Sequence, residues 1–318
     1  MDLRPWIRRS IVLGVLAATV SYARYRQRVA STAHESQNIT ERHASAFLVR
    51  RSIDEDRLES VREAVADRCV DPDDPRPLLG LEGAATATLF LDAGDDPELI
   101  WYVEVPHAAM ADWENPESRI EAAFPLEDDA LVAEEARVDR ELLVHAVNPN
   151  RPRTATGTDD GPLAVSGAAL ENSVDIALVQ LHLKPGLAER LADRFAGLSR
   201  RVAAGEIELG PVERWSAAML EAESMYTESV VLERRPEGYV LCGYMETAEM
   251  AGVYDAYYDT WNPVARASEL VFGRVLEEPA AVLEYPLGTG LEVLAHAVAP
   301  DRPRRPETSR IGGSDTTP

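Results

Sequence analysis

The chain has 318 residues, enough for two domains of ordinary size, and its 45% hydrophobic content is enough to build two cores. Its formal net charge is −23, from 55 acidic against 32 basic side chains, and Lys184 is the only lysine. The arginines are scattered among carboxylates and form no basic stripe, so we expect no nucleic-acid partner. This balance is typical of a halophilic protein, because multimolar salt screens the self-repulsion of an acidic surface.

Cys69 and Cys242 are the only cysteines, and neither has a partner at the spacing of a metal site. We therefore expect no zinc site and no disulfide framework, and the sequence contains no motif for a nucleotide or another cofactor. Two buried free thiols are the favoured interpretation. A single bridge between them is the alternative.

The N-terminal segment, residues 1–43, contains an apolar run that begins at Ile11 and ends at Ala23, after the pair Arg8-Arg9. The run is shorter than the roughly 20 residues of a membrane-spanning helix. It suits the core of an export signal, and the arginine pair is similar to a twin-arginine signal, although basic residues also follow the run and disfavour cleaved export. We expect a membrane-associated or exported N-terminus. A cytoplasmic amphipathic leader is the alternative.

Residues 44–153 are expected to form a first unit. It opens with a strand at FLVRRSID, from Phe47, and a helix over EDRLESVREAVADR. Strands at EGAATATLFLD, from Glu82, and at WYVEVP, from Trp101, follow on either side of the turn AGDDPE. A second helical region and the closing strand ELLVHAV complete the unit.

Residues 154–173 are rich in Gly, Ala, Ser and Thr, and they predict a linker. Residues 174–305 then repeat the same order of elements, from the strand ALVQLHLK and the helix GLAERLADRFAGLSRRV to the closing strand EVLAHAV. Residues 306–318 are expected to be a disordered tail.

One phrase makes the repeat plain. VHAVNPNRPR at 144–153 returns as AHAVAPDRPR at 295–304, with seven of ten positions identical. The order β-α-β-β-α-β, twice, predicts an α+β fold of two tandem ferredoxin-like copies. A single such sheet would leave an apolar face in water, so we expect the copies to dock sheet to sheet as an intrachain dimeric α+β barrel.

The second copy carries VQLHLKPGLAERL, MYTESVVLE, GYMETAEM and HAVAPDRP. On these motifs it resembles a haloarchaeal member of the family known as domain of unknown function 6176. The resemblance covers residues 174–303 and, more weakly, 44–152. It implies a fold similar to the dimeric α+β barrels of antibiotic biosynthesis monooxygenases, and it implies no chemistry, because that family has no established activity. The first copy departs from the pattern at the turn Lys184-Pro185-Gly186 and at Met225.

The candidate catalytic residues are polar side chains that occur in both copies. His145 and His296 lie among apolar residues on the closing strands, where an imidazole could act as a base or could be a hydrogen-bonded core residue. Tyr244 and Glu246 share a strand face and complete the set; a buried carboxylate there could accept a proton or belong to a structural pair.

The candidate ligand-binding residues include the counterparts Tyr102 and Glu104 in the first copy. Arg151 and Arg302, each followed two residues later by another arginine, form extended Arg-Pro arms; we expect them to pair with the protein's own carboxylates, with an anionic ligand as the alternative. Gln180 and His182 share a face of the first strand of the second copy, opposite Arg50 and Ser52 of the first, and predict unequal half-sites.

Three functional classes follow. The first is a non-catalytic module that binds a small organic ligand or is purely structural. The second is a cofactor-free monooxygenase or isomerase, which would need a cavity between the sheets that exposes these polar residues. The third is a membrane-tethered partner-binding protein, which depends on the run from Ile11 to Ala23.

Overall fold

The computed structural model describes residues 43–302, apart from 134–137, 149–150, 159, 171–173, 209 and 289–290. The run from Ile11 to Ala23 and the tail 306–318 lie outside the described residues. Inside them, no helix combines the length and the apolar character that crossing a membrane requires. We call residues 43–158 the first half and residues 160–302 the second half.

Two antiparallel sheets form the centre of the molecule, so the fold is α+β, as predicted. The larger sheet has the order β4-β1-β3-β2-β10-β6, with bounds β1 Ala44–Ile53, β2 Thr86–Asp92, β3 Glu98–Pro106, β4 Leu131–Ala133, β6 Ala164–Ser166 and β10 Leu291–Val298. The smaller sheet has the order β5-β8-β9-β7, with bounds β5 Asp139–Val147, β7 Asp175–His182, β8 Met225–Arg235 and β9 Gly238–Thr247.

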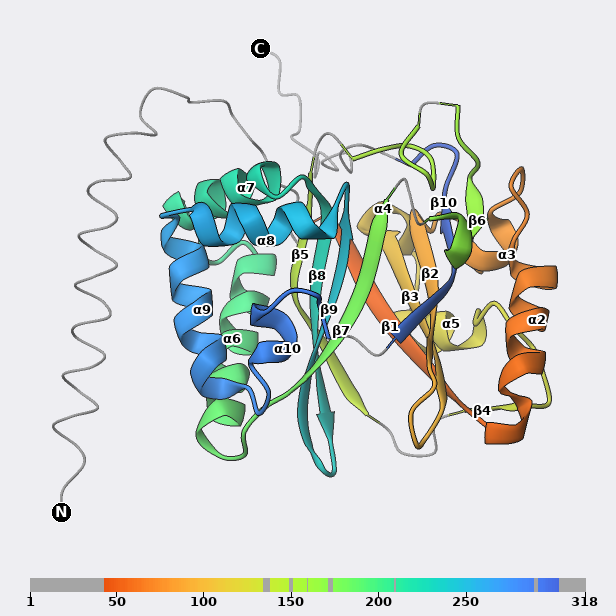
Figure 1. The fold of residues 1–318 in the computed structure, drawn as a ribbon, viewed down its shortest axis with the longest axis horizontal. Coiled ribbons are helices and arrows are strands. Elements are labelled where there is room, and N and C mark those ends of the chain that lie inside the picture. Colours follow the sequence, from red (N-terminus) through yellow and green to blue (C-terminus); the bar gives the residue numbers. More distant parts are fainter. Residues whose placement is uncertain are drawn as a thin grey trace, which may run out of the picture.

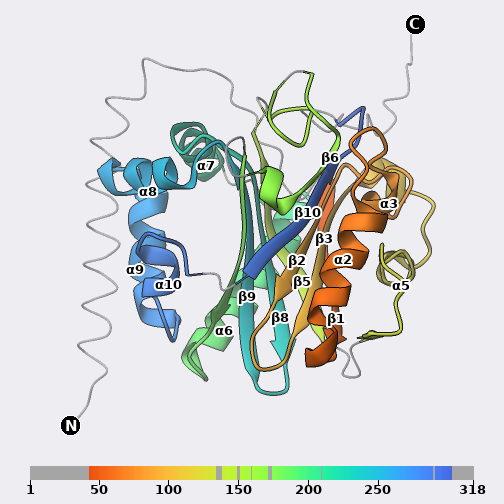
Figure 2. The same ribbon diagram turned by 45° about the vertical axis from the view of Figure 1, so that its right-hand side comes forward.

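The helices lie on the outer faces of the two sheets, which gives four layers (Figure 1, Figure 2). The first half contributes the 3-10 turn η1 Glu55–Arg57 and the helices α2 Leu58–Cys69, α3 Arg76–Leu79, α4 His107–Met110 and α5 Pro116–Ala122. The second half contributes η2 Gly167–Ala169, α6 Leu187–Ala203, α7 Pro211–Ala222, α8 Met250–Asp259, α9 Pro263–Val275 and α10 Ala280–Leu283. The predicted order of strands and helices is therefore present in both halves, with additional short elements and with α7, which no pattern above predicted.

The closing strands correct one prediction. A ferredoxin-like copy keeps its fourth strand in its own sheet, but here β5 of the first half pairs with β8 of the second, and β10 of the second half pairs with β2 of the first. The smaller sheet thus combines three strands of the second half with β5, and the larger sheet combines four strands of the first half with β10 and the short β6. Without this exchange, β2 and β8 would each expose one unpaired edge. β10 and β5 cover those edges as antiparallel partners.

The two sheets pack face to face, as predicted. An apolar cluster between them joins Phe90, Ile100 and Tyr102 of the larger sheet to Val240 and Tyr244 of the smaller. The sheet edges also approach each other at two seams, β1 beside β5 and β10 beside β7, so the interior is closed like a barrel. Alternate residues of the same strands face outward and pack beneath the helices.

Local sequence explains where two helices begin. Asn115 and Asn262 accept hydrogen bonds at the starts of α5 and α9, and a proline follows each of them in the first turn. The segment 154–173, predicted as a linker alone, also supplies β6, which pairs with β10 at the edge of the larger sheet. Its residue Gly167 approaches the backbone of Val293 so closely that a Cβ would meet the carbonyl oxygen.

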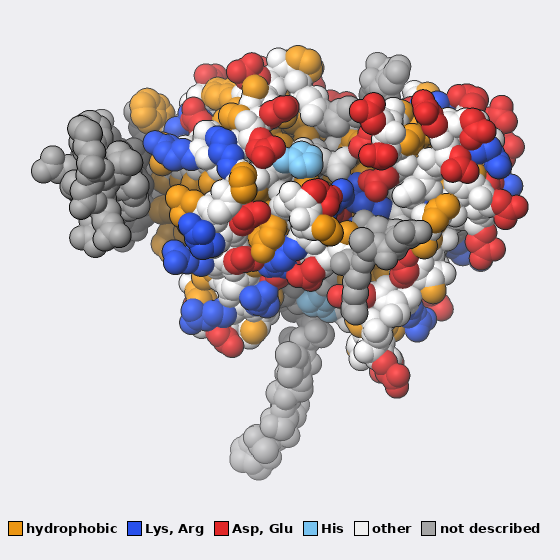
Figure 3. Space-filling view, turned by 90° about the horizontal axis from the view of Figure 1, so that it is seen from below, with side chains coloured by type: hydrophobic (Ala, Val, Ile, Leu, Met, Phe, Trp, Pro, Cys, Tyr) orange, Lys and Arg blue, Asp and Glu red, His pale blue; other side chains and the backbone are white. Residues whose placement is uncertain are grey.

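The surface carries the acidity of the composition. On the face in Figure 3, acidic side chains are spread widely and are interspersed with arginines. Several surface arginines take part in ion pairs, such as Arg62 with Glu292. Pairs of this kind contribute little stability one by one, and they leave a large excess of negative charge facing the solvent.

Candidate functional site

Two tyrosines mark the centre of the space between the sheets. Tyr102 on β3 and Tyr244 on β9 stack with their ring centroids 3.6 Å apart and their planes 4° from parallel. Burial, followed by the neighbouring charge of Glu104 or Glu246 respectively, raises the pKa of each phenol well above its usual range. Both phenols are therefore neutral at physiological pH, and each must find a hydrogen-bond partner inside the protein.

Each phenol begins a short hydrogen-bond relay that crosses from one sheet to the other. Tyr102 Oη lies 2.9 Å from Ser229 Oγ, which lies 2.9 Å from His145 Nδ1. Tyr244 Oη lies 3.3 Å from the hydroxyl of Thr88, which lies 2.9 Å from His296 Nδ1. In each relay the imidazole and the hydroxyl belong to paired strands of one sheet, and the phenol comes from the opposite sheet.

Two carboxylates flank the relays, and each holds an arginine. Arg151 donates to both oxygens of Glu104, at 2.8 and 3.0 Å, and Thr86 donates to the same carboxylate at 3.0 Å. Arg302 donates to both oxygens of Glu246, at 2.9 and 2.5 Å. Thr227 adds a hydrogen bond to Glu246 at 3.2 Å. The expectation that the Arg-Pro arms pair with the protein's own carboxylates is confirmed for Arg151 and Arg302.

The arginine arms also connect the sheets. Arg151 follows β5, which belongs to the smaller sheet, and reaches Glu104 on β3 of the larger. Arg302 follows β10, which belongs to the larger sheet, and reaches Glu246 on β9 of the smaller. The closing strand of each half therefore lies in the sheet of the other half. The arginine that follows it forms an ion pair with a strand of its own half, β3 or β9.

We call these residues the central network. Its members are Thr86, Thr88, Tyr102, Glu104, His145, Arg151, Thr227, Ser229, Tyr244, Glu246, His296 and Arg302, and none has more than 1% of its surface exposed. The structure thus brings together all four candidate catalytic residues and four of the six candidate ligand-binding residues. The other four members, Thr86, Thr88, Thr227 and Ser229, are the hydroxyl residues that bond to them.

Burial sets the charge states of the central network. It lowers the pKa of both His145 and His296 to about 4, against the opposing influence of Glu104 and Glu246. It would raise the pKa of Glu104, but Arg151 and His145 outweigh it and hold that pKa at about 2. Neutral imidazoles between ion-paired carboxylates are therefore the stable state near neutral pH.

Each imidazole keeps one unused nitrogen. Nε2 of His145 and Nε2 of His296 are buried and have no hydrogen-bond partner among the residues that the structure describes. His145 Nε2 lies 3.8 Å from Glu104 Oε1, which is beyond hydrogen-bond distance. Nε of Arg302 is unsatisfied in the same way. A buried unsatisfied nitrogen costs free energy, so these three atoms are the points at which the described part of the network could still engage another molecule.

Gln180 and His182 do not join the central network. His182 is exposed at the end of β7. Gln180 accepts a hydrogen bond from Arg50 at 2.8 Å and donates to Asp92 at 3.0 Å, so it bridges the two sheets at another level of the interior. Arg153 is exposed, and Arg304 lies outside the described residues.

The contacts of Arg50 form a second buried charge cluster that the sequence analysis missed. Arg50 is 1% exposed and donates to Glu233 at 3.0 Å and to Glu98 at 2.7 Å. Burial would raise the pKa of Glu233, but Arg50, Arg140 and Arg235 outweigh it and hold that pKa at about 2. The counterpart of Arg50 in the repeat is Gln180, a different residue type, so the criterion of the same residue in both copies passed over this cluster.

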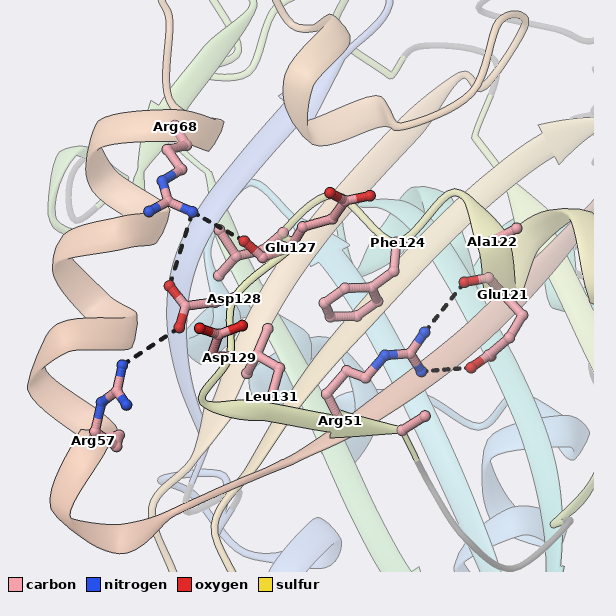
Figure 4. Close-up of a pocket in the computed structure, with 12 residues that line it drawn as sticks. Arg51, Arg57, Arg68, Glu121, Ala122, Phe124, Glu127, Asp128, Asp129 and Leu131 are labelled. Carbon is pink, nitrogen blue, oxygen red and sulfur yellow. Dashed lines mark hydrogen bonds and ion pairs between the residues drawn. The ribbon is translucent and has the colours of Figure 1, made fainter.

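A hollow of about 750 Å3 opens on the surface of the first half, beside α2 and α5 (Figure 4). Its basic side chains already have acidic partners. Arg51 pairs with Glu121 at 2.5 Å, and both Arg57 and Arg68 lie within 4 Å of Asp128, at 3.6 and 3.8 Å. The hollow is therefore a network of surface ion pairs.

A smaller cavity, of about 190 Å3, lies in the second half between the smaller sheet and the helices α7, α8 and α9. We call it the helix-side cavity. Its lining is mainly apolar and aromatic, and it includes four of the six methionines of the chain; the lining residues are Ser216, Met219, Leu220, Glu223, Met225, Glu228, Met245, Met250, Val253, Tyr254, Tyr257, Val264, Ala265, Ser268, Phe272, Val282, Leu283 and Leu287.

Two carboxyl groups, Glu223 and Glu228, line this cavity. Glu223 is 8% exposed, and among the described residues neither side chain has a hydrogen-bond or ion-pair partner. Burial, assisted by Glu228, raises the pKa of Glu223 to about 8, and burial also raises the pKa of Glu228. An acid pair without a basic partner contrasts with Glu104, Glu246 and Glu233, each of which holds an arginine.

The first half has no equivalent acid pair. In the strand ladders, Glu228 pairs with Met245 as Ala87 pairs with Val103, so an alanine occupies the position of Glu228. Two residues along, on the same face of the sheet, Trp101 of the first half corresponds to Gly243 of the second. The Trp101 indole is fully buried in the core beneath the helices, where its nitrogen donates to the carbonyl of Leu78 at 3.1 Å. Large apolar side chains fill the first half where the second half is lined by acids.

The described residues contain no group of three or more His, Cys, Asp or Glu side chains placed to hold a metal ion. Cys69 on α2 and Cys242 on β9 are both buried and free, as the favoured interpretation predicted. Burial raises the pKa of both thiols, so neither is a reactive thiolate.

No protein-family model and no curated protein matches the chain, so membership of the family known as domain of unknown function 6176 stays a prediction. Among solved structures, a candidate monooxygenase from Fusobacterium nucleatum subsp. nucleatum is 9% identical, with a TM-score of 0.39 over 80% of this chain and 92% of that chain. A candidate monooxygenase from Lactobacillus acidophilus is 11% identical, with a TM-score of 0.34 over 80% and 93%. An anthrone oxidase-like protein is 12% identical, with a TM-score of 0.28 over 82% and 94%. Likeness of this degree carries no argument about the chemistry of this chain.

Proposed function

We propose that the protein is a non-catalytic module that binds a small organic ligand. The central network locks the two sheets together, and the helix-side cavity holds the ligand. The observation that carries the proposal is Glu223, a buried carboxyl group without a partner that lines a cavity of about 190 Å3. Such a cavity can accept a ring-sized molecule, since about 150 Å3 is enough for benzene.

The burial of the central network supports this division of roles. A cofactor-free enzyme needs its acid, base and substrate in one accessible pocket. The repeated Tyr, His, Glu and Arg residues are instead bonded to one another and are at most 1% exposed. Buried ion pairs and hydroxyl relays of this kind specify how two surfaces dock, because any other alignment of the sheets would leave charges unpaired.

Calorimetric titration with benzyl alcohol, a neutral probe of the size of the cavity, tests the proposal. We expect saturable binding to the full chain in multimolar KCl. Ser268→Phe, which places a ring among the lining residues of α9, should weaken binding at least tenfold. Ala267→Phe adds the same ring at the exposed neighbouring position and should leave binding unchanged. Absence of binding, or equal binding to both variants, would overturn the proposal.

A cofactor-free oxygenase or isomerase is the second candidate, and one observation favours it. The buried Nε2 atoms of His145 and His296 have no partners in the described part of the chain, and each imidazole is linked through a hydroxyl to a tyrosine. Nitrogen NMR of the imidazoles during titration with small phenols and ketones tests this candidate. A saturable shift at either Nε2 would support it, and unperturbed resonances would exclude it for those compounds.

We also infer that the chain is an intrachain dimeric α+β barrel that arose by tandem duplication. The matching strand orders of the two sheets and the reciprocal exchange of β5 and β10 support this history. Attachment to a membrane through the run from Ile11 to Ala23 stays a proposal of its own. Fractionation of the full chain against a chain lacking residues 1–42 tests it: sedimentation of only the full chain with membranes would support attachment.

A further inference from the structure

We infer that the helix-side cavity binds a small hydrophobic amine as its cation: one apolar group of about the size of a benzene ring that carries one ammonium group. This inference rests on the proposed function and names the chemistry of its ligand.

The charge of the lining points to a cation. The lining contains two acids, Glu223 and Glu228, and no Lys, Arg or His. Glu223 caps the end of α7 and Glu228 lies on β8, so two different elements place carboxyl groups at one cavity. Elsewhere in the interior, buried carboxylates hold guanidinium groups of the chain itself. At Glu223 and Glu228 the lining itself supplies no basic side chain, so the same chemistry would draw the cation from a ligand.

The remaining lining favours an apolar amine over an inorganic cation. Methionine side chains adapt to the shape of a bound apolar group, and four of them line the cavity, Met219, Met225, Met245 and Met250. The rings of Tyr254 and Tyr257 on α8 and of Phe272 on α9 add aromatic surface. Aromatic faces attract an alkylammonium group within about 6 Å. A metal ion would instead require about six oxygen ligands, which this lining does not offer.

Size and hydrogen bonding favour a primary amine. An ammonium group has three N–H donors, and two carboxylates can accept all of them, whereas a guanidinium group would present a larger, planar fork of five donors. At about 190 Å3 the cavity has room for a ring and a short amino-bearing arm, which excludes peptides. Benzylamine is therefore the probe that matches the cavity.

Binding must be linked to a proton. Burial and the mutual repulsion of the two acids keep a proton on Glu223 up to a pH of about 8 in the free protein. An ammonium group stabilises the ionised carboxylate, so binding at neutral pH transfers the proton of the carboxyl group to solvent, while the amine keeps its own proton. The other titratable side chains that line the cavity are the phenols of Tyr254 and Tyr257. Burial raises the pKa of Tyr254 to about 12 and also raises that of Tyr257, so both phenols are neutral at the pH values of the test. Affinity for the amine should then rise with pH, by up to about tenfold per pH unit, until it levels near pH 8.

Calorimetric titration of the full chain with benzylamine and benzyl alcohol, near pH 6 and near pH 8, tests the inference. We expect benzylamine to bind at least tenfold more tightly than benzyl alcohol near pH 8, and to lose most of this preference near pH 6. Repeating the titration at neutral pH, where Glu223 of the free protein still holds its proton, in buffers of different ionisation enthalpy should show about one proton released per benzylamine and none per benzyl alcohol.

Variants locate the effect. Glu223→Gln should remove at least tenfold of the preference for benzylamine over benzyl alcohol, and Glu228→Gln should act in the same direction. Glu82→Gln is the matched control, because Glu82 is the aligned residue of the first half and is exposed. The proton count on the unaltered chain needs no substitution, so it stands even if a variant fails to fold.

The outcomes separate the two proposals. Binding of benzyl alcohol without a preference for benzylamine would overturn the amine inference and leave the ligand-binding function in place. Failure of both compounds to bind would overturn both. Tighter binding of benzylamine without proton release, or with full retention in Glu223→Gln and Glu228→Gln, would also overturn the assignment of the cation to these two acids.

Discussion

Tyr102 and Tyr244 stack with their ring centroids 3.6 Å apart, and the hydroxyl of each bonds to a hydroxyl of the opposite sheet. The two residues occupy equivalent rungs of the β2-β3 and β8-β9 ladders. The stack is therefore a direct contact between the two halves, made by the same residue type at equivalent positions. Energetic coupling between the two rings is a direct measure of how the sheets are held together.

A double-mutant cycle measures that coupling. Tyr102→Leu and Tyr244→Leu should each destabilise the protein by about 3 kcal/mol, because each removes a buried ring and a hydrogen bond. The double variant should cost less than the sum by about 0.5–1.5 kcal/mol, the worth of the lost ring contact. Denaturant unfolding in multimolar KCl is the measurement. Phe195→Leu, on the exposed part of α6, should instead be additive with either substitution.

Breaking one arginine pair of the central network should be strongly destabilising. Arg151→Met leaves Glu104 buried without its partner, which typically costs about 3–5 kcal/mol. Adding Glu104→Leu should recover much of that loss, since it removes the unpaired charge. Arg76→Met, at an exposed pair, is the control and should have no measurable effect. If Arg151→Met had as little effect as Arg76→Met in the same unfolding assay, the ion pair of Arg151 with Glu104 would not hold the two sheets together.

The two central histidines should make the protein sensitive to acid. Burial lowers their folded pKa to about 4, whereas the unfolded chain binds protons from about pH 6.5 downward. The stability they contribute is therefore complete above pH 6.5 and is lost as the pH falls toward 4. Each should account for a loss on the order of 3 kcal/mol across that window. The double variant His145→Gln/His296→Gln should be less stable at neutral pH but should show a flatter profile in acid. A profile as steep as that of the unaltered chain would contradict this assignment.

Glu223 should act in the opposite pH direction. Burial raises its folded pKa to about 8, above the 4.5 of an ordinary glutamate, so the folded state holds a proton that the unfolded chain releases. Rising pH between these values therefore removes stability. In unfolding experiments, Glu223→Gln should match the stability of the unaltered chain near pH 4.5. Above pH 8 it should be more stable by several kcal/mol, the free energy that corresponds to the pKa shift of Glu223. A constant difference at all pH values would show that Glu223 does not titrate in this way.

Apolar periodicity and turn chemistry predicted the α+β class and the order of elements, but not which edge each closing strand joins. The pattern ELLVHAV in β5 alternates in the same way whether its neighbour is β1 or β8. Pairing depends on tertiary contacts such as Arg151 with Glu104, which only the folded chain reveals. The helix α7 was not predicted, because the repeat indicates only those elements that both halves share.

The central network could be found from sequence because its residues recur. Tyr102 and Tyr244, or His145 and His296, appear at the same place in each copy. The helix-side cavity could not be found in this way, since Ala87 stands at the position of Glu228, and Glu82, the counterpart of Glu223, is exposed. A different signal was present: Glu228 lies on the outward face of β8, in line with the partly buried residues Tyr226 and Val230. A lone acid on an otherwise apolar strand face indicates either a pair or a ligand.

The reciprocal exchange of closing strands constrains how the protein is made. The edge of β2 is paired only by β10, the last strand of the described chain. At synthesis rates of about 5–20 residues per second, that edge waits on the order of ten seconds or more for its partner. A nascent chain therefore spends this time with an open, apolar edge, a state prone to aggregation in which contact with chaperones is expected. Only the emergence of β10 from the ribosome ends this exposure, so the two halves mature together.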